Sequence, residues 1–280
     1  MERAKKIIEE LRLRSIPPTE QEILNILREY LQTLILKFVF QSRFGAALSF
    51  MGGTALRICY GTKRYSEDLD FSLYDKKVSY RFPALMELIL KELRLRGFDV
   101  NTTVSGDKIV QKGFFRFAGL GPVFGLKGFG KDQKLHVKFE VDVEPPPLKK
   151  EERESFFVNR FQEIFPILLH TLPTLFAGKV LAILYRPYAR GRDYYDLIWY
   201  LSRKTELNLD YLNRGAFGEK FKNVPAVLKR VEECVEQANP AVILKDVGRF
   251  LEDPSEIKWL SEYDKVFHQL LKTAPTRLRG

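Results

Sequence analysis

The sequence predicts an α+β fold in which a mixed α/β amino-terminal half is followed by an α-rich carboxy-terminal half. Two observations predict this class. Strand-like alternation is concentrated between residues 68 and 143, whereas residues before 50 and nearly all residues after 147 have helical periodicity. The run Pro145-Pro146-Pro147 separates the two patterns. We therefore expect one domain over 1–147 and a second, helical domain over 148–280.

Local signals predict the individual elements. The first fifty residues have helical patterns, and Pro17-Pro18-Thr19-Glu20 marks a break and a fresh helix start. Helical periodicity over 83–96 ends at Gly97, because a glycine commonly stops a helix. We expect the other elements to be strands at 98–104, 109–118 and 135–143, a glycine-rich connection at 119–130, and helices after 147 apart from one short stretch.

The composition is that of a globular protein with an excess of positive charge. The 280 residues are 45% hydrophobic and 29% charged, and the formal net charge is +10. A chain of this length can bury the core of one large or two modest domains. Clustered Lys and Arg gain affinity for nucleic acids by releasing counterions from phosphates, although such an excess also serves simply to solubilise a surface.

The sequence argues against secreted, membrane and zinc-binding classes. The two cysteines lie far apart and the three histidines form no ligand pair, so structural zinc is not expected. Residues 1–13 alternate charged and apolar residues and lack the apolar core of a signal peptide. The apolar stretch 34–50 is interrupted by polar residues and is too polar to span a bilayer. We expect a cytoplasmic protein with reduced cysteines and no membrane partner.

A glycine turn and an acidic pair lie close together in the amino-terminal half. Gly52-Gly53 precedes an expected helix, and Asp68 and Asp70 share one face of the strand that follows. Like charges at this spacing are costly unless a cation lies between them, and Mg²⁺ prefers carboxylate oxygens. The glycines let backbone N–H groups approach a triphosphate, towards which the helix points its positive end. Either motif alone is common on surfaces, but both in this order indicate metal-assisted nucleotidyl transfer.

The strand expected at 135–143 presents a second polar face. Its alternation places His136, Lys138, Glu140 and Asp142 on one side and valines and a phenylalanine on the other. A face with two carboxylates can bind a metal. The alternative is an edge strand whose charged face is solvated.

The glycine-rich connection contains a decoy and an aromatic cluster. Gly125 to Lys131 fits G-x-x-x-x-G-K, but Asp132 replaces the required Ser or Thr and strand residues follow, so we expect a hairpin loop. The phenylalanines at 114, 115, 117, 124 and 129 are interleaved with basic residues. They form either a stacking surface for single-stranded nucleic acid or ordinary core packing.

A lysine and two aspartates are the chemical candidates in the carboxy-terminal half. Lys179 is bracketed by apolar residues, so we expect it to face inward, where its ammonium can hold a triphosphate. Pro187 and Gly191 mark a break before the next helix, of which Asp193 is a candidate N-terminal cap, and Asp196 lies one turn further on. Either aspartate orients Lys179, or the Lys–Asp pair is purely structural.

These segments resemble the motifs of a known family. Gly52 to Leu56 and Arg64 to Phe71 resemble the G-G-T-A-L and R-x-S-x-D-h-D-h pattern of the AbiEii/AbiGii toxin family, within the DNA polymerase β-like nucleotidyltransferase superfamily. Lys138-Phe139-Glu140 resembles the family's K-h-[DE] motif. The later lysine and R-D-x-x-D-L motifs resemble Lys179 and residues 192–197. The resemblance covers roughly residues 50 to 200 and leaves the terminal helices unassigned.

The resemblance implies a polymerase β-like core, a mixed sheet with flanking helices, and an α-helical carboxy-terminal region that contributes to the active-site cleft. It implies a nucleotidyltransferase that depends on Mg²⁺, with Mn²⁺ as an alternative metal, and releases pyrophosphate. The implied metal ligands are Asp68, Asp70 and Glu140, with Asp142 as the second choice for the third carboxylate. The further catalytic residues are Lys179, Asp193 and Asp196. The implied nucleotide-binding residues are Gly52, Gly53, Thr54, Arg64, Ser66, Lys138 and Lys179.

The same resemblance implies a toxin of a toxin–antitoxin or phage-defence system. Its acceptor would be the tRNA 3′ end or another RNA, and its antitoxin would be encoded by a neighbouring gene. One alternative is a catalytically idle module that binds RNA or a partner on the same scaffold; another is nucleotidyl transfer to a small molecule or protein. The intact acidic pair argues against the idle module, because an idle site has no chemical need for clustered like charges.

Overall fold

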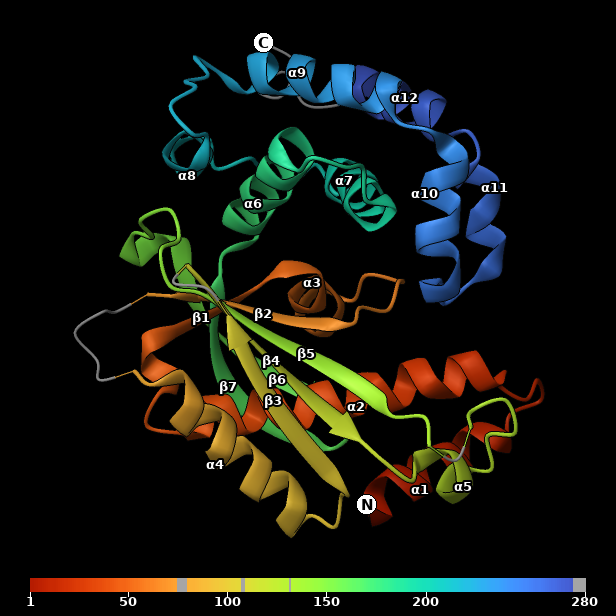
Figure 1. Cartoon of the computed structure of the whole chain (residues 1–280). Coiled ribbons are helices and arrows are strands. Elements are labelled where there is room, and N and C mark those ends of the chain that lie inside the picture. The colour runs from red at the N-terminus through yellow and green to blue at the C-terminus, as the bar shows by residue number, and fades with distance from the viewer. Residues whose placement is uncertain (75–79, 107–108, 131, 274–280) are drawn as a thin grey trace. The chain divides into compact units, whose positions relative to one another are not determined.

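Helices and one sheet form two compact units in the part of the chain that the structure describes (Figure 1). The computed structural model describes residues 1–74, 80–106, 109–130 and 132–273. The sheet unit comprises Met1–Gly61, Tyr65–Glu144 and Ser155–Leu169. The helical unit comprises Thr62–Arg64, Pro145–Glu154 and His170–Gly280. The chain passes from the sheet unit to the helical unit at Pro145, returns to the sheet unit over Ser155–Leu169, and continues in the helical unit from His170.

The strands form one mixed sheet. Within the described residues its order is β3-β4-β5-β2-β1-β7-β6. β2 lies antiparallel to β1 and parallel to β5, which in turn lies antiparallel to β4, and β1 lies parallel to β7. The strand bounds are β1 Leu48–Met51, β2 Asp68–Leu73, β3 Val100–Gly106, β4 Val110–Phe117, β5 Leu135–Asp142, β6 Arg153–Arg160 and β7 Glu163–His170.

Helices of the sheet unit pack against this sheet (Figure 1). α2 and α4 contact the rings of Phe71 and Phe139 through Phe40 and Phe82, and α3, which follows β1, contacts α2 through the ion pair of Arg57 with Glu29. The helix bounds are α1 Glu2–Arg12, α2 Glu20–Gln41, α3 Gly52–Tyr60, α4 Phe82–Leu95 and α5 Leu120–Phe124, with a short 3₁₀ turn at Gly45–Ala47.

Two predicted helix ends are confirmed by their local geometry. Thr19 precedes α2, and its Oγ1 accepts a hydrogen bond from the Glu22 backbone N–H, which satisfies one donor at the start of the helix. Gly97 follows α4 with a φ of +81°, a left-handed conformation that glycine adopts without strain. The predicted strands at 98–104, 109–118 and 135–143 are confirmed as β3, β4 and β5, with ends shifted by one or two residues.

An aromatic core fills the side of the sheet that faces α2 and α4. The Phe139 ring is fully buried and stacks on the Phe71 ring with centroids 4.8 Å apart. Its centroid also lies 6.4 Å from that of Phe115 on β4 and 6.0 Å from that of Phe82 at the start of α4. Because side chains alternate along a strand, burying Phe71 and Phe139 turns the neighbouring acidic residues to the opposite face.

The hairpin β6–β7 corrects the expectation that the chain is helical beyond the prolines. These two strands join the edge of the sheet next to β1. Their two-residue turn, Phe161 and Gln162, has φ values of +52° and +63°. Such turns normally carry Asn or Gly, so the usual hairpin signal is absent from the sequence. Phe161 is held in place by packing edge-on against Tyr30, with ring centroids 5.6 Å apart.

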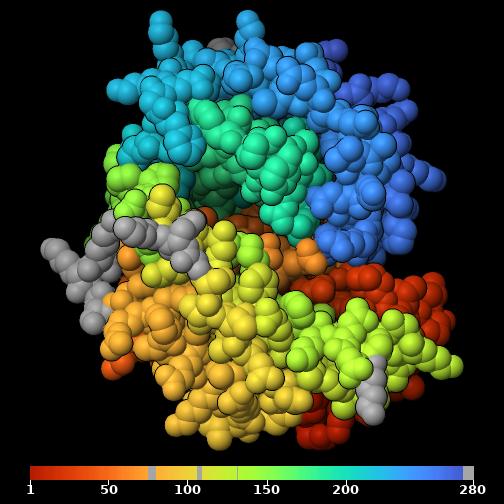
Figure 2. Space-filling model, in the orientation of Figure 1, coloured from red at the N-terminus to blue at the C-terminus, as the bar shows by residue number. Residues whose placement is uncertain are grey.

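The glycine-rich connection is a folded part of the sheet unit. Figure 2 shows it as a yellow-green surface beside the red amino-terminal helices. The Glu20 carboxylate accepts hydrogen bonds from the backbone N–H groups of Lys127 and Gly128, each at 2.8 Å. The backbone N–H groups of this loop thus bind a carboxylate of the protein itself. The loop also contains α5, which we did not predict, whereas Lys131 lies outside the described residues.

Of the two alternatives for the five phenylalanines of this region, a stacking surface or core packing, the structure shows core packing for four. Phe115, Phe117, Phe124 and Phe129 are all buried. Only Phe114 lies on the polar face, where the Arg116 guanidinium lies 5.8 Å from its ring centroid. A stacking surface built from all five rings is therefore wrong.

The helical unit contains most of the remaining residues. An aromatic stack between Phe176 and Tyr200, with centroids 4.5 Å apart, lies between its first two helices. The helix bounds are α6 Leu172–Tyr185, α7 Gly191–Ser202, α8 Leu209–Gly215, α9 Val224–Gln237, α10 Pro240–Val247, α11 Ile257–Leu260 and α12 Tyr263–Thr273. Short 3₁₀ turns occur at Lys150–Glu152, Gly248–Phe250 and Pro254–Glu256.

A buried carboxylate attaches the segment after the prolines to α8. Glu152 accepts hydrogen bonds from Arg214 at 2.5 and 2.6 Å and from Asn208 at 2.9 Å. Burial alone would raise the pKa of Glu152, but Arg214 and the Lys149 backbone N–H outweigh it and hold this pKa below its ordinary value.

Among the described residues, no helix combines the length and apolar character needed to cross a bilayer.

The aromatic core supplies a test of the sheet unit. Phe139→Ala should lower the free energy of unfolding by about 3–5 kcal/mol, because it leaves a cavity against three rings. Phe157 on β6 is 67% exposed, so Phe157→Ala should change stability by less than about 0.5 kcal/mol. Urea unfolding followed by far-ultraviolet circular dichroism measures both. Equal losses would show that Phe139 does not anchor the core.

Candidate active site

The acidic pair predicted on β2 faces a third carboxylate on β5. In the parallel pairing of these strands, Asp68 is opposite Lys138 and Asp70 is opposite Glu140. Strand alternation directs these four side chains to the face away from the buried phenylalanines. The three carboxylates that were singled out in two separate sequence segments therefore belong to one face of adjacent strands.

The same register distinguishes the two candidates for the third carboxylate. Asp142 is opposite Ser72, and this pair lies two residues further along the strands than the pair of Asp70 and Glu140. Its Oδ1 accepts a hydrogen bond from the Glu144 backbone N–H at 3.0 Å, which commits it to the end of β5. Glu140 is thus the neighbour of Asp70, and its role as a metal ligand remains a prediction.

Lysines surround Glu140 on this face. The Lys138 Nζ lies 2.6 Å from one carboxylate oxygen of Glu140, and the Lys112 Nζ lies 3.9 Å from the other. All three side chains are partly exposed, so the pairs remain open to exchange with a ligand. Asp68, Asp70 and Glu140 supply the hard oxygen donors that Mg²⁺ prefers, and Lys138 is placed to contact an anion bound beside them. By their chemistry these donors suit a magnesium ion.

Gly52 lets the chain pass directly over Asp70. It begins α3 with a φ of +79°. A Cβ atom at this position would collide with Asp70 Oδ2 and lie 3.0 Å from the Asp70 Cβ and Cγ atoms. Only glycine satisfies both the backbone conformation and the close approach. The positive end of α3 therefore starts beside the acidic pair, as an anion site at a helix N-terminus requires.

Thr54 and Ser66 connect this helix and the approach to β2 to the rest of the unit. The Thr54 hydroxyl is buried and donates to the Asp68 backbone carbonyl, which attaches α3 to β2. The Ser66 carbonyl accepts a hydrogen bond from Gln32 on α2 at 3.1 Å. Gly53 is the second residue of α3 and is partly exposed. For Thr54 the structure shows a scaffolding bond; nucleotide contacts by Gly53, Thr54 and Ser66 remain predictions.

An ion-pair network that no sequence motif indicates connects α3 to α2 and β6. Arg57 donates to Glu29 on α2 at 2.7 Å, and Arg160 on β6 reaches the same carboxylate at 3.0 Å. The Arg57 guanidinium also covers the Tyr65 ring, 4.4 Å from its centroid. Arg57 follows the G-G-T-A-L run directly, but its partners come from distant segments, so no local signal identifies the network.

In the helical unit, the second set of candidates forms a buried cluster. The Lys179 ammonium on α6 lies 2.7 Å from Asp193 and 2.8 Å from Asp196, both on α7. Arg64 donates to both oxygens of Asp196, at 2.7 and 2.5 Å, and Arg186 donates to Asp193. Three cations therefore surround two carboxylates.

The electrostatics of the cluster favour its charged form. Burial alone would raise the pKa of Asp193, but Lys179 and Arg186 outweigh it and hold this pKa below its ordinary value. Burial alone would lower the pKa of Arg64, but the Asp196 carboxylate outweighs it and raises this pKa. Removing one partner would leave a buried charge uncompensated.

This cluster refines several predictions. The N-terminal residue that caps α7 is Arg190, without a side-chain cap, so Asp193 is not the cap we expected. Both aspartates pair with Lys179, which agrees equally with orientation of the lysine and with a purely structural role. Arg64 is fully buried and its guanidinium holds the Asp196 carboxylate. A nucleotide contact by Arg64 remains a prediction. The catalytic roles of Lys179, Asp193 and Asp196 also remain predictions.

One histidine has acidic neighbours that the sequence did not indicate. His268 on α12 places Nδ1 3.1 Å from Glu232 on α9, and Glu236 lies one turn further along that helix. Ligand atoms of these three residues lie within 4.8 Å of one another. Glu236 is exposed and the other two side chains are partly exposed, so the three residues form a cluster of ionisable groups at the protein surface.

Comparisons with known proteins bear on the family and the fold of this chain. A family model described as the nucleotidyl transferase AbiEii toxin of type IV toxin–antitoxin systems matches residues 35–277. No curated protein matches the chain. The crystal structure of JHP933 from Helicobacter pylori is similar, with a TM-score of 0.54 and 17% sequence identity over 89% of this chain and 94% of that chain.

A second solved structure from H. pylori, provisionally assigned as a nucleotidyltransferase, has the same TM-score and identity. The match covers 89% of this chain and 96% of that chain. At this identity the two structures bear on the fold: the mixed sheet with flanking helices that the sequence predicts is confirmed.

The close approach of Gly52 to Asp70 can be tested against a matched glycine. Gly61 ends α3 with a φ of +70° and has open space around its missing side chain. Gly61→Ala should therefore cost only the left-handed strain, about 1–2 kcal/mol. Gly52→Ala should cost more, because it adds a collision with Asp70. Thermal unfolding of both variants measures the difference; equal losses would contradict the steric role of Gly52.

The cluster around Asp193 should give a pH-dependent contribution to stability. Because the pKa of Asp193 is lowered in the folded state, its ion pairs stabilise fully above the ordinary carboxyl pKa, about 4, and are lost as the pH falls through the lowered value. Asp193→Asn should thus be less stable than the wild type by a constant margin between about pH 5 and 7, and the margin should shrink below about pH 4. Thermal unfolding across this range measures it. A margin independent of pH would contradict the ionised pair.

Proposed function

Because the chain belongs to the AbiEii nucleotidyl transferase toxin family of type IV toxin–antitoxin systems, we propose that it transfers a nucleoside monophosphate from an NTP to an acceptor hydroxyl. We propose the 3′ end of tRNA as the acceptor and pyrophosphate as the leaving group. The observation that carries the proposal is the β2–β5 register, which brings Glu140 beside Asp70 on the face that also carries Asp68. This is the carboxylate set that in-line phosphoryl chemistry with bound metal requires.

In the proposed mechanism, Asp68, Asp70 and Glu140 hold Mg²⁺, with Mn²⁺ as an alternative. When bound, the metal neutralises charge on the phosphate oxygens and lowers the pKa of the attacking hydroxyl. Glu140 orients that hydroxyl or accepts its proton. The backbone N–H groups at the start of α3 receive the triphosphate, which Gly52 and Gly53 allow to approach closely.

The basic residues complete the proposed chemistry. Lys138 is already paired with Glu140 and can exchange this contact for a phosphate oxygen. For Lys179 we propose that its ammonium balances charge on the transferred phosphate, with Asp193 and Asp196 holding it in one orientation. Ser66 and Arg64 are proposed to position the nucleotide, Arg64 by supporting Asp196.

The family also bears on biological context. Its members are toxins of type IV toxin–antitoxin systems. We therefore propose a cytoplasmic toxin that is neutralised by an antitoxin from a neighbouring gene and that serves in phage defence. The net charge of +10 supports an RNA acceptor, because a basic surface attracts the phosphate backbone.

Transfer of label from each α-³²P-labelled NTP to total tRNA, with Mg²⁺ present, tests the activity. Asp68→Asn, Asp70→Asn and Glu140→Gln should each lower the rate by about a hundredfold or more, the scale of a lost transition-state contact. Asp142→Asn is the matched control, because Asp142 lies on the same face but opposite Ser72, and it should retain nearly full activity.

Metal binding gives the same test a second readout. Calorimetric titration with Mn²⁺ should show weaker binding to Asp68→Asn and unchanged binding to Asp142→Asn. Full transfer activity in Asp68→Asn, or binding of RNA by the wild type with no label transferred from any NTP, would overturn the proposal.

A further inference from the structure

A cavity of about 310 Å³ lies wholly within the helical unit. It is a partly open pocket lined by the end of α6, the connection at 186–190, the start of α7 and one side of α9. Three arginines line it: Arg186 and Arg190 at the two ends of the connection 186–190, and Arg230 on α9. Asp193 is the carboxylate among its lining residues.

The charge balance of this cavity favours an anionic ligand. Among the described residues that line the cavity, Asp193 is the one carboxylate beside three arginines, and it also pairs with Lys179 and Arg186, so the lining carries an excess of positive charge. Arg230 pairs with Glu233 on its own helix, at 2.8 Å, but both side chains are about half exposed, and such a pair contributes little and exchanges readily. The guanidinium groups are suited to the planar, bidentate recognition of phosphate oxygens.

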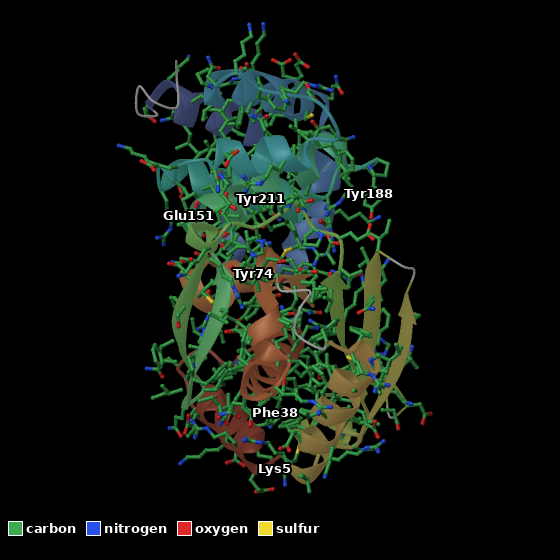
Figure 3. All side chains as sticks on the ribbon, turned by 90° about the vertical axis from the view of Figure 1, so that its left-hand side faces the viewer. Lys5, Phe38, Tyr74, Glu151, Tyr188 and Tyr211 are labelled. Atoms are coloured by element: carbon green, nitrogen blue, oxygen red, sulfur yellow. The ribbon has the colours of Figure 1, made fainter. Side chains whose placement is uncertain are left out.

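The remaining lining residues suit a nucleotide rather than a free phosphate ion. Tyr188 is 66% exposed and lies at the surface of the helical unit (Figure 3). An aromatic ring at the mouth of a basic pocket is a surface on which a base can stack. Gln237 adds an amide that can donate to and accept from the edge of a base. The cavity volume is at the lower end of the range for ligand pockets.

We propose that this pocket binds one nucleotide of single-stranded RNA, with its phosphate between the arginines and its base on Tyr188. The proposal rests on the proposed function, for which it supplies a contact with the acceptor strand. The same chemistry could receive the phosphates of an NTP. An NTP, however, is bound with Mg²⁺, which requires carboxylate ligands, and the lining offers only Asp193, which is already paired twice. A phosphodiester needs no metal, so an RNA strand fits this lining better.

Two substitutions and a matched control test the pocket. Fluorescence anisotropy should be measured with a labelled eight-nucleotide single-stranded RNA, and calorimetry with each Mg·NTP. Tyr188→Ala should weaken RNA binding about fivefold or more, as loss of one stacked base does. Arg230→Ala should weaken it and reduce the salt dependence by about 0.7 in the slope of log K against log salt concentration, the share of one phosphate. Mg·NTP affinity should be unchanged in both.

Lys229→Ala is the control, because Lys229 is exposed on α9 next to Arg230 and outside the pocket, and removes the same charge. It should weaken RNA binding less than twofold. Equal effects of Lys229→Ala and Arg230→Ala would show a diffuse basic surface and overturn the pocket. Weaker Mg·NTP binding with unchanged RNA binding would assign the pocket to the nucleotide substrate and also overturn it.

These outcomes are separate from those of the proposed function. The binding assays contain no transfer step, and they can be repeated in the Asp68→Asn background. Loss of RNA affinity in Arg230→Ala supports the pocket whether or not the wild type transfers nucleotide. Unaltered RNA affinity in both Arg230→Ala and Tyr188→Ala rejects the pocket even when transfer is found.

Discussion

The candidate active site depends on the parallel pairing of β2 with β5. Parallel strands need a long connection, and here that connection includes α4, β3, β4 and α5 before the chain returns as β5. The register is set by the side of the sheet that is buried, where Phe71 and Phe139 stack. A slip of one residue would turn the carboxylates into the core. Aromatic packing on one face therefore positions the acidic residues on the other.

Close approach is the second constraint at this site. A helix can offer its N-terminal N–H groups to a phosphate only if the chain enters it directly beside the acidic residues. Gly52 permits this entry, because a side chain there would occupy the space of the Asp70 carboxylate. Thr54 then attaches the helix to β2 through the Asp68 carbonyl. Backbone geometry and acidic chemistry are thus coupled within a few residues.

Buried ion pairs hold the catalytic candidates of the helical unit in place. Lys179 has two carboxylate partners, and each of these has an arginine partner of its own. A network of this kind is costly to break at any member, because every remaining charge is desolvated. It also fixes the direction of a lysine that would otherwise have four flexible bonds.

Local patterns were reliable guides to the elements that carry the chemistry. The strand with Asp68 and Asp70, the helix start at Thr19 and the helix stop at Gly97 all follow from alternation, capping and glycine conformation, which act over a few residues. The hairpin β6–β7 was not predicted, because its turn contains Phe161 and Gln162 instead of the usual Asn or Gly. Tertiary packing of Phe161 on Tyr30 supports that turn, and packing is invisible in a local pattern.

By itself, the sequence determined which residues can act as acids, bases and phosphate contacts, since these depend on side-chain chemistry and short spacing. Only the tertiary structure placed Glu140 opposite Asp70 and Asp142 opposite Ser72, because strand register relates residues that are seventy positions apart. Only the tertiary structure also placed Arg64 with Asp196 and gathered three arginines around one cavity. Such groupings depend on long-range contacts, whose geometry no local periodicity encodes.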